Sequence, residues 1–331
     1  MTIGILGGGV WGSALAKLFS NQEVLIYTRD KKVMNSINDH HFNPKLKYAI
    51  FNDNVKATDD LEEIAKKNII FIALPSQSIR EVLSKSYFQN LDADIIIASK
   101  GIEISSSMFL SSLVESLIKP KSLSIMSGPC FSDEVAQDLP TAATFASSNT
   151  SIFDTISGML KGKKFRIYYS DDVIGCQIGG ALKNVIAIAT GICDGLGLGF
   201  NTRAALITRG LVEISRIGTK LGARPETFYG LTGLGDLVLT CTGDLSRNRQ
   251  LGIELGKGKS LEEITENMKM VAEGVLTVKS AYSLIKKFNV QAAIMEETYR
   301  VLYEKKSPGK ALEDLMKMEI SSEFAGIEGL Q

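Results

Sequence analysis

The sequence predicts an α/β N-terminal domain built on a doubly wound parallel sheet, followed by an all-α C-terminal domain. The chain has 331 residues, more than one ordinary hydrophobic core accommodates, so two domains are expected. The first half alternates short apolar runs with helical patterns, as doubly wound domains do. From about Val173 helical periodicity dominates. These observations place the domains at residues 1–172 and 173–331.

The strands expected in the first domain are continuous apolar runs, the pattern of strands buried on both faces of a parallel sheet. Helical patterns lie between several of these runs. The expected strands are Ile3–Leu6, Val24–Tyr27, Ile69–Leu74, Ile95–Ser99, Leu123–Ser127, Thr141–Ala146 and Phe165–Tyr169, and the expected helices are Ser13–Phe19, Leu61–Lys67, Ile79–Ser84 and Ser107–Ile118.

The second domain contains helical patterns and no convincing strand. We expect its last residues, Ser321–Gln331, to be loosely held, as chain ends commonly are. The expected helices are Val173–Gly191, Arg203–Leu221, Arg247–Leu255, Leu261–Asn267, Val275–Phe288, Ile294–Tyr303 and Ala311–Met316.

Composition and charge exclude several classes of function. Lys plus Arg and Asp plus Glu both number 37, so there is no electrostatic reason to expect nucleic acid or an anionic membrane as partner. The N-terminus reads as a strand rather than a signal peptide. No apolar run reaches the ~20 residues that span a bilayer, so no stable membrane insertion is expected.

The cysteines and histidines narrow the chemistry further. The four cysteines form no CxxC pair, and unpaired thiols are typical of a reducing cytosol, so we expect a cytoplasmic protein. The only histidines, His40 and His41, are adjacent in a polar stretch and are expected at the surface. Ser-His-Asp catalysis and histidine-based metal sites are therefore nearly excluded, and no metal site is predicted.

Lys183 is the one charged residue within the apolar helical stretch Gly179–Ala189. Apolar residues cover most sides of this helix, so it should be buried nearly all round. Lysine is almost never fully buried unless it has a partner or a function. Desolvation lowers the pKa of a buried ammonium, which lets a lysine exchange protons near neutral pH. The alternative is a lysine that extends to a helix end or pairs with a carboxylate.

The segment Gly7-Gly8-Gly9-Val10-Trp11-Gly12 matches G-x-G-x-x-G, between a predicted strand and a predicted helix. Gly7 permits a tight turn, Gly9 lets the backbone approach a pyrophosphate, and Gly12 lets helix and strand pack closely. Free N–H groups at the helix start bind phosphates. The motif predicts a dinucleotide-binding Rossmann domain, with a purely structural glycine turn as the alternative.

The end of the second strand bears on the choice of cofactor. An NAD site usually has an acid there for the ribose 2′-hydroxyl, whereas arginine suits a 2′-phosphate. This chain has Arg29, followed directly by Asp30. We expect NAD or NADP as cofactor, with NADPH mildly favoured. A solvated Arg29 without a role is the alternative.

Polar residues elsewhere add candidates. Lys100 follows a strand, at the edge of the sheet where ligands of open α/β folds bind, although surface lysines are common there. Asp236 lies between apolar neighbours, so it should pair with a cation or be protonated, and Lys183 is the obvious partner.

Ser246 is a good N-cap, which puts Arg247 and Asn248 in a first helical turn. Arginine at that end makes sense if it receives an anion such as phosphate.

At these residues the chain resembles the bacterial glycerol-3-phosphate dehydrogenases that use NAD or NADP, from Ile3 to about Tyr303. The resemblance implies hydride transfer that interconverts dihydroxyacetone phosphate, a phosphorylated triose, and sn-glycerol 3-phosphate. It also implies supply of glycerol 3-phosphate to phospholipid synthesis, and a homodimer formed by the helical domain. The most specific segments are SGPCFSDEV at Ser127–Val135, IGGALKNVIAIATGICDG at Ile178–Gly195, LTGLGDLVLTCT at Leu231–Thr242, and SRNR at Ser246–Arg249.

The resemblance also implies residue roles. Lys183 would be the proton donor or acceptor for the substrate hydroxyl, with Lys100 and Asp236 as the other catalytic residues. Cys130 departs from the Ser or Thr usual in the family, and a thiol is the weaker hydrogen-bond partner. The substrate site would comprise Lys100, Gly128, Cys130, Lys183, Asn184, Asp236, Ser246, Arg247 and Asn248, and the cofactor site Gly7, Gly9, Val10, Trp11, Gly12, Arg29, Lys100, Ser132, Arg247, Val271 and Glu273.

Two other functions stay open on the sequence. Two-domain dehydrogenases of the 3-hydroxyacid or 6-phosphogluconate type also place a lysine and an asparagine on one helix of this kind. A dinucleotide-sensing protein without turnover is the second alternative, although it has no use for a buried lysine, an acid and an anion-binding helix.

Overall fold

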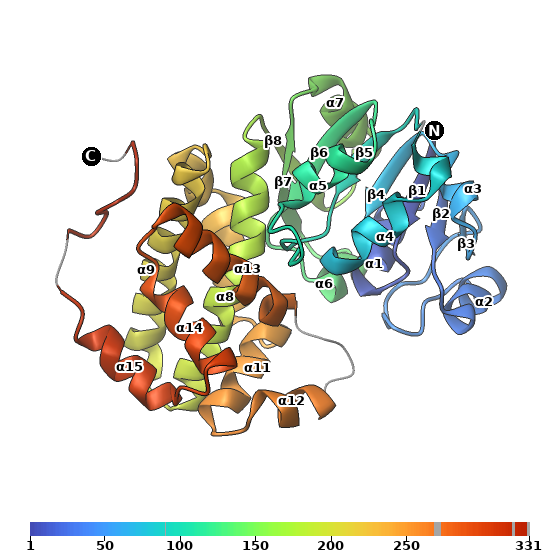
Figure 1. Ribbon diagram of the computed structural model, residues 1–331. Coiled ribbons are helices and arrows are strands. Elements are labelled where there is room, and N and C mark those ends of the chain that lie inside the picture. Colours follow the sequence, from blue (N-terminus) through green and yellow to red (C-terminus); the bar gives the residue numbers. More distant parts are fainter. Residues whose placement is uncertain (90, 268–272, 320–321, 330–331) are drawn as a thin grey trace. The chain divides into compact units, whose positions relative to one another are not determined.

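The computed structural model describes residues 1–89, 91–267, 273–319 and 322–329 (Figure 1). The chain folds into two compact units. The first comprises Met1–Lys100 and Leu110–Val173, and the second comprises Gly101–Phe109 and Ile174–Gln331. The short segment 101–109 therefore packs with the helical unit although it lies in the first half of the sequence. Its Ile102 is fully buried in the core of that unit.

The first unit is an eight-stranded sheet with the order β3-β2-β1-β4-β5-β6-β7-β8. Apolar residues of neighbouring strands pair in register, for example Ile5 with Ile26 and with Phe71. The strands are β1 (Thr2–Leu6), β2 (Glu23–Tyr27), β3 (Val55–Thr58), β4 (Ile69–Ile72), β5 (Asp94–Ile97), β6 (Ser122–Ser127), β7 (Thr141–Ser147) and β8 (Phe165–Ser170).

The doubly wound fold is confirmed, with two refinements. The sheet is parallel from β3 through β6, but β7 runs antiparallel to β6 before β8 runs parallel to β7. All expected strands are present, with ends within two residues of the prediction. The short strand β3 was not expected, because its sequence VKAT has no continuous apolar run.

Helices flank this sheet. The pairs α1 with α6 and α4 with α5 pack together. Helix α5 begins later than predicted because Ser107 has a left-handed backbone, with φ 56°. The polar helix α2 was missed, since only Val33 and Ile37 are buried in it. The helices are α1 (Val10–Leu18), α2 (Lys31–His40), α3 (Leu61–Ala65), α4 (Ile79–Leu83), α5 (Leu110–Leu117), α6 (Ser132–Ala136) and α7 (Thr150–Met159), with 3-10 turns at Ser76–Ser78 and Ser86–Phe88.

The second unit is helical, as predicted. Its core gathers apolar side chains from α8, α9, α11, α13 and α14. The helices are α8 (Val173–Gly195), α9 (Gly199–Lys220), α10 (Asp236–Thr242), α11 (Arg247–Gly256), α12 (Leu261–Asn267), α13 (Glu273–Phe288), α14 (Ala293–Tyr303) and α15 (Pro308–Met316), with a 3-10 turn η3 at Pro225–Tyr229 and a π-helix η4 at Leu231–Gly235.

Helices α8 and α11 approach each other closely at two pairs of glycines. A Cβ atom on Gly191 would lie 2.1 Å from the Arg249 carbonyl oxygen, and one on Gly252 would lie 2.2 Å from the Ile188 carbonyl oxygen. One turn further along, Gly195 and Gly256 repeat the arrangement. Both helices thus present glycines four residues apart, and no side chain fits between the backbones. Small residues at this spacing let helix backbones pack closely.

The length and composition of helix α8 bear on whether the chain contains a membrane-spanning helix. Helix α8 has 23 residues and contains an 18-residue window of mean hydropathy 1.4, so by length and composition alone it could cross a bilayer. This length and composition differ from the expectation that no apolar run reaches the ~20 residues that span a bilayer. However, 78 % of the apolar window is buried inside the structure, and the core helix of a folded domain has the same signature.

The described part of the chain end, residues 322–329, is anchored rather than loose. The Arg216 guanidinium donates to the Ala325 carbonyl at 2.5 Å, and Arg209 donates to the Glu323 carbonyl at 2.5 Å. Ile327 is 1 % exposed. Two arginines of α9 and one buried isoleucine therefore hold a segment whose own sequence has no periodic pattern.

Glu213 of α9 caps a neighbouring helix from within the core. Its two carboxyl oxygens accept from the backbone N–H groups of Ile294 at 2.7 Å and Met295 at 3.1 Å, in the first turn of α14. The α14 N-cap residue, Ala292, makes no side-chain cap bond. Burial raises the pKa of Glu213 from its ordinary 4.5 to about 7, against the lowering effect of the two N–H groups and of Arg216 and Arg209.

We predict that Glu213→Gln removes a pH-dependent part of the stability. The folded state binds the Glu213 proton more tightly than the unfolded chain does, so this group's stabilising contribution is complete below pH 4.5 and is lost as pH rises through about 7. Thermal unfolding of both proteins from pH 4.5 to 8 measures it. The Tm advantage of the native chain over the variant should shrink as pH rises, and a difference that is constant across this range would contradict the assignment.

Candidate active site

The glycine loop of the first unit has the geometry that the motif predicts. Gly7 has φ 124°, and a Cβ there would lie 2.5 Å from the Ala73 carbonyl oxygen, so only glycine makes this turn. A Cβ on Gly12 would lie 1.8 Å from the Gly7 carbonyl oxygen, so glycine is needed where α1 packs on the loop. A Cβ on Gly9 would meet nothing within 4 Å, which leaves room for a ligand above this residue.

The start of α1 has the features of a phosphate-binding terminus. Gly9 is its N-cap and supplies no side-chain acceptor, and the first turn contains no acid. The N–H groups of this turn are therefore available to an anion. Trp11 is half-buried, and its indole N–H donates to the Ala98 carbonyl at 3.0 Å. Val10 is half-buried beside it in the same turn.

Asn43 supports the loop and was not predicted. It is fully buried, and its Nδ2 donates to the Gly8 carbonyl at 3.2 Å and to the Ser13 hydroxyl at 2.5 Å. A Cβ on Gly8 would lie 2.6 Å from the Thr28 Cβ, so the loop also packs against the residue after β2. The only sequence signal for Asn43 is its position in a polar segment, which indicates no such contact.

Arg29 and Asp30, which follow β2, are the two candidates for contact with the cofactor ribose, and their surroundings differ. Asp30 accepts from the backbone N–H groups of Lys32 at 3.1 Å and Val33 at 3.3 Å, as the N-cap of α2. Its other oxygen pairs with Lys45 at 2.8 Å. These bonds, the Lys45 bond foremost, hold the pKa of Asp30 below its ordinary value. Arg29 is exposed, and within the described part of the chain its guanidinium has no ion-pair partner.

The remaining candidates of the first unit lie after β5 and β6. Lys100 is half-buried and its Nζ donates to the Gly128 carbonyl at 2.9 Å. Gly128 has φ 155°, and a Cβ there would lie 2.9 Å from the Ala143 Cα, so the backbone is tight at this point. Cys130 is half-buried, and Ser132 is the first residue of α6.

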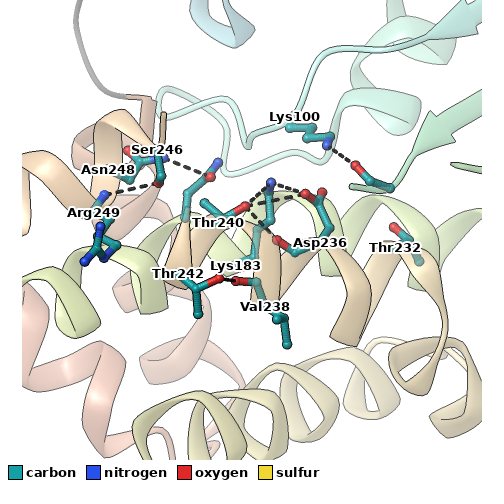
Figure 2. A network of polar contacts seen from close by, with 12 residues as sticks. Lys100, Lys183, Thr232, Asp236, Val238, Thr240, Thr242, Ser246, Asn248 and Arg249 are labelled. Atoms are coloured by element: carbon teal, nitrogen blue, oxygen red, sulfur yellow. Dashed lines mark hydrogen bonds and ion pairs between the residues drawn. The ribbon is translucent and has the colours of Figure 1, made fainter. Parts of the chain in front are cut away.

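The centre of the second unit is a buried ion pair (Figure 2). The Lys183 Nζ lies 2.5 Å from the Asp236 Oδ1, and the two side chains are 8 % and 1 % exposed. Nζ also donates to the Thr240 hydroxyl at 2.6 Å, and this hydroxyl donates to the Asp236 carbonyl at 2.6 Å. The predicted pairing of Lys183 with Asp236 is therefore present, with Thr240 as a third member.

Thr240 was not among the sequence candidates. It follows Asp236 by one helical turn on α10, so the two side chains face the same side. The sequence patterns predict no helix over residues 231–242. The signal that points to Thr240 is its spacing of four residues from Asp236, which is informative only once α10 is known to be a helix.

Tight backbone packing positions Asp236. A Cβ on Gly179 of α8 would lie 2.7 Å from the Thr232 carbonyl oxygen, and the Thr232 hydroxyl donates to the Cys176 carbonyl at 2.7 Å. The π-helix η4 thus lies directly against α8 one turn before Lys183. Helix α10 continues from η4 with Asp236 as its first residue. Irregular π turns inside helices frequently mark functional sites.

Cys241 lies next to this group but is not suited to thiolate chemistry. It is fully buried, and burial raises the pKa of its thiol to about 12. A thiol with such a pKa stays protonated at neutral pH and is a poor nucleophile.

Ser246 begins α11 as predicted. Its hydroxyl accepts from the Arg249 backbone N–H at 3.3 Å, which places Arg247 and Asn248 in the first turn. Arg247 is exposed, whereas Arg249 is buried and donates from Nε and Nη2 to the Asp194 carboxylate at 2.8 Å. The two arginines of the SRNR segment thus have different surroundings. Arg247 is at the surface, and Arg249 lies in the contact between α8 and α11.

Asn184 and Asn248 form a polar chain that ends on α13. The Asn248 Nδ2 donates to the Asn184 Oδ1 at 2.9 Å, and the Gly274 backbone N–H donates to the Asn248 Oδ1 at 3.1 Å. Glu273 is the first residue of α13 and is half-buried. The predicted cofactor residue Val271 lies outside the described residues.

The structure therefore groups the candidates by unit. The glycine loop, Arg29, Lys100, Gly128, Cys130 and Ser132 belong to the first unit. Lys183, Asn184, Asp236, Ser246, Arg247, Asn248 and Glu273 belong to the second. Among the described residues, no three His, Cys, Asp or Glu side chains are grouped so that they could hold a metal ion.

Comparison with known proteins gives the family. Residues 2–153 match the family model of the NAD-dependent glycerol-3-phosphate dehydrogenase N-terminus, and residues 172–313 match that of the C-terminus. The chain is 43 % identical to the glycerol-3-phosphate dehydrogenase (NAD(P)+) of Citrifermentans bemidjiense over 329 residues, covering 97 % of this chain and 98 % of the relative. It is also 43 % identical to that of Myxococcus xanthus, covering 98 % and 99 %.

Solved structures agree with this assignment. The crystal structure of glycerol-3-phosphate dehydrogenase from Coxiella burnetii matches with a TM-score of 0.89 and 34 % identity, covering 96 % of this chain and 99 % of that one. A D-mandelate dehydrogenase matches with a TM-score of 0.62 at 12 % identity and 92 % coverage of this chain, 98 % of that one, which reflects the fold alone. By the family models, the sequence identity and the solved structure together, the chain belongs to the NAD-dependent glycerol-3-phosphate dehydrogenase family.

Proposed function

We propose that Lys183 is the proton donor and acceptor of this enzyme. The family reaction interconverts dihydroxyacetone phosphate and sn-glycerol 3-phosphate with NAD or NADP. The observation that carries the proposal is the buried Lys183–Asp236–Thr240 group, because two neighbours orient a buried ammonium that can exchange a proton with a substrate oxygen. The 3-hydroxyacid and sensing alternatives lose their basis with the family assignment.

The bound nicotinamide supplies or accepts the hydride at the substrate carbon. In reduction, the Lys183 ammonium gives a proton to the carbonyl oxygen as it becomes a hydroxyl. In oxidation, the neutral amine takes that proton back. Asp236 and Thr240 hold Nζ from two sides and so fix the direction from which it meets the substrate oxygen. The geometry is set before substrate binds, which lowers the cost of orientation.

The two domains divide the work in this proposal. Residues 1–172 bind the dinucleotide, with its pyrophosphate on Gly9 and the uncapped first turn of α1, which includes Val10 and Trp11. Residues 173–331 bind the phosphorylated triose and form the dimer. In the first unit we assign Lys100, Gly128 and Cys130 to substrate binding, and Lys100 also to cofactor binding. The further residues that we assign to cofactor binding are Ser132, Arg247, Val271 and Glu273.

Arg247 is the proposed anchor for the substrate phosphate. It lies exposed in the first turn of α11, where helix N–H groups attract an anion. Its guanidinium adds a planar fork of donors that lysine does not reproduce. A three-carbon substrate has little apolar surface, so its phosphate supplies most of the binding and orientation.

Arg29 favours NADP over NAD in this proposal. A carboxylate for the ribose hydroxyls would have to come from Asp30, but its oxygens are bonded to the start of α2 and to Lys45. The exposed Arg29 guanidinium beside it suits a 2′-phosphate.

We also propose a cytoplasmic homodimer that supplies glycerol 3-phosphate for phospholipid synthesis. No disulfide joins the four cysteines, all of which lie among the described residues, and this fits a reducing compartment. The start of α9 exposes Phe200 to 79 %, an apolar surface of the kind that subunit contacts cover. Sedimentation equilibrium of the full chain distinguishes a dimer from a monomer.

We predict that Lys183→Ala lowers kcat by ~10²–10⁴-fold in dihydroxyacetone phosphate reduction, the scale of a positioned acid or base. Cofactor affinity should stay close to native, measured by fluorescence of the single tryptophan, Trp11. Lys183→Arg is the control for folding, because a guanidinium keeps the charge opposite Asp236 but does not release its proton. It should be folded and equally slow. Native turnover in either folded variant would overturn the assignment.

We predict that Arg247→Lys lowers kcat/KM for dihydroxyacetone phosphate about 10–150-fold, the equivalent of a charged hydrogen bond of roughly 1.5–3 kcal/mol. Unphosphorylated dihydroxyacetone, a poor substrate, should be almost unaffected. The measurement is the native-to-variant ratio of kcat/KM for each substrate. Equal ratios would place the effect of Arg247 on the cofactor or the fold instead of the phosphate.

We predict that Arg29→Ala weakens NADPH binding by roughly 1.5–3 kcal/mol through loss of a charge-assisted contact, with little change for NADH. Titration of Trp11 fluorescence with each cofactor measures both affinities. Lys161→Ala, which removes another exposed cation of the same unit, controls for general electrostatics and should leave both unchanged. Equal losses for NADPH and NADH in Arg29→Ala would show that Arg29 supports the loop rather than reading the ribose.

A further inference from the structure

We propose that Lys45 is a specificity-determining residue for NADP, a second cation that contacts the cofactor 2′-phosphate together with Arg29. This inference rests on the proposed cofactor site and adds to it a residue that lies outside the glycine motif. The Lys45 Nζ lies 2.8 Å from the Asp30 Oδ2, and Asp30 directly follows Arg29 in the chain.

The backbone of Lys45 is held by the same residue that supports the glycine loop. The Lys45 N–H donates to the Asn43 Oδ1 at 2.9 Å, and the Asn43 Nδ2 donates to the Gly8 carbonyl at 3.2 Å. Asn43 is fully buried, so one buried amide joins the two segments. In Rossmann domains the pyrophosphate lies on the glycine loop and the ribose at the end of the second strand. Lys45 is anchored to the first of these places, and its ammonium lies at the second.

The Lys45 ammonium is accessible to a ligand. The side chains of Lys45 and Asp30 are 43 % and 38 % exposed. An ammonium has three N–H donors, and among the described residues Lys45 forms one ion pair, so donors are left for a second anionic group. An exposed ion pair contributes little to stability, so Lys45 can turn toward a phosphate at small cost. A phosphate monoester carries about two negative charges at neutral pH, which makes it the stronger partner.

The charges around the end of β2 favour a ligand with added negative charge. Residues 28–33 and 43–48 contain five exposed cations and a single acid, Asp30. NADP differs from NAD only by the 2′-phosphate, so an excess of positive charge at this place favours NADP. The five cations are Arg29, Lys31, Lys32, Lys45 and Lys47.

Lys45→Ala tests the contact. We expect the Kd for NADPH and for 2′,5′-ADP to rise roughly 5–20-fold, because a charge-assisted hydrogen bond is lost. The Kd for NADH and for 5′-AMP should not rise, since neither ligand has a 2′-phosphate. Trp11 fluorescence measures the two dinucleotides, and calorimetry measures the two mononucleotides. Lys45→Arg, which keeps the cation, should retain the preference for NADPH. An equal loss for NADPH and NADH in Lys45→Ala would overturn the proposal.

Lys47→Ala is the matched control. Lys47 is an exposed lysine of the same segment, and its Nζ lies 5.4 Å from the centre of the Tyr48 ring. This variant removes the same charge two residues away and should bind NADPH with native affinity. If Lys47→Ala and Lys45→Ala weaken NADPH binding equally, the effect is one of net charge, and the assignment of Lys45 is wrong.

An Asp30→Asn background separates contact with the phosphate from neutralisation of Asp30. Asparagine is also a good N-cap, so the start of α2 is preserved, but the charge that pairs with Lys45 is removed. If Lys45 contacts the phosphate, Lys45→Ala should weaken NADPH binding at least about fivefold in this background as well. If Lys45 only neutralises Asp30, its removal will have no effect once Asp30 is uncharged, which contradicts the proposal.

Failure of the proposed cofactor site gives a different result. Native NADPH affinity in both Arg29→Ala and Lys45→Ala would place the 2′-phosphate elsewhere and overturn the site together with this inference. Weaker NADPH binding in Arg29→Ala alone would leave the cofactor site standing and overturn only the role of Lys45.

Discussion

The close contact between α8 and α11 is the constraint on which the rest of the second unit depends. Glycines on both helices let the backbones meet with no side chain between them. The contact is reinforced where Arg249 of α11 and Arg203 of α9 share the Asp194 carboxylate of α8. Lys183 and Asn184 lie on α8, and Arg247 and Asn248 form the start of α11. This helix crossing therefore brings together the residues that we propose for proton transfer and for anion binding. A methyl group at any of these glycines would separate them.

The buried ion pair is costly in isolation and is stabilised by its neighbours. Removing one partner of such a pair typically destabilises a protein by about 3–5 kcal/mol, since the other charge stays buried. Thr240 contributes an additional acceptor to Lys183, and η4 packs against Gly179 so that Asp236 has little freedom to move. The Lys183–Asp236–Thr240 group, to which we assign proton transfer, is thus held rigidly. Rigidity of this kind suits a reaction in which the cofactor supplies the hydride and the protein supplies orientation and a proton.

In the first unit, residues outside the glycine motif determine the surroundings of the glycine loop. The three motif glycines are required by close backbone contacts or by space for a ligand, but Asn43 and Lys45 come from a segment with no recognisable pattern. Asn43 stabilises the loop through hydrogen bonds to the Gly8 carbonyl and the Ser13 hydroxyl. Lys45 pairs with the Asp30 carboxylate. In the proposed cofactor site, this residue outside the motif therefore bears on the choice between NAD and NADP.

The sequence by itself determined the strand-helix alternation, the change to helices near Val173, the glycine loop, and the candidacy of Lys183 and Asp236. Each of these is a local pattern, because burial on both faces of a sheet or all round a helix leaves a continuous apolar signature. Only the tertiary structure decided which residues contact one another. The antiparallel β7, the burial of segment 101–109, Thr240 beside Lys183, the split roles of Arg247 and Arg249, and the Asn184–Asn248–Gly274 chain all join residues far apart in sequence or hidden by an irregular turn. Their spacing contains no period, so their contacts follow from how helices and strands pack and not from the order of residues along the chain.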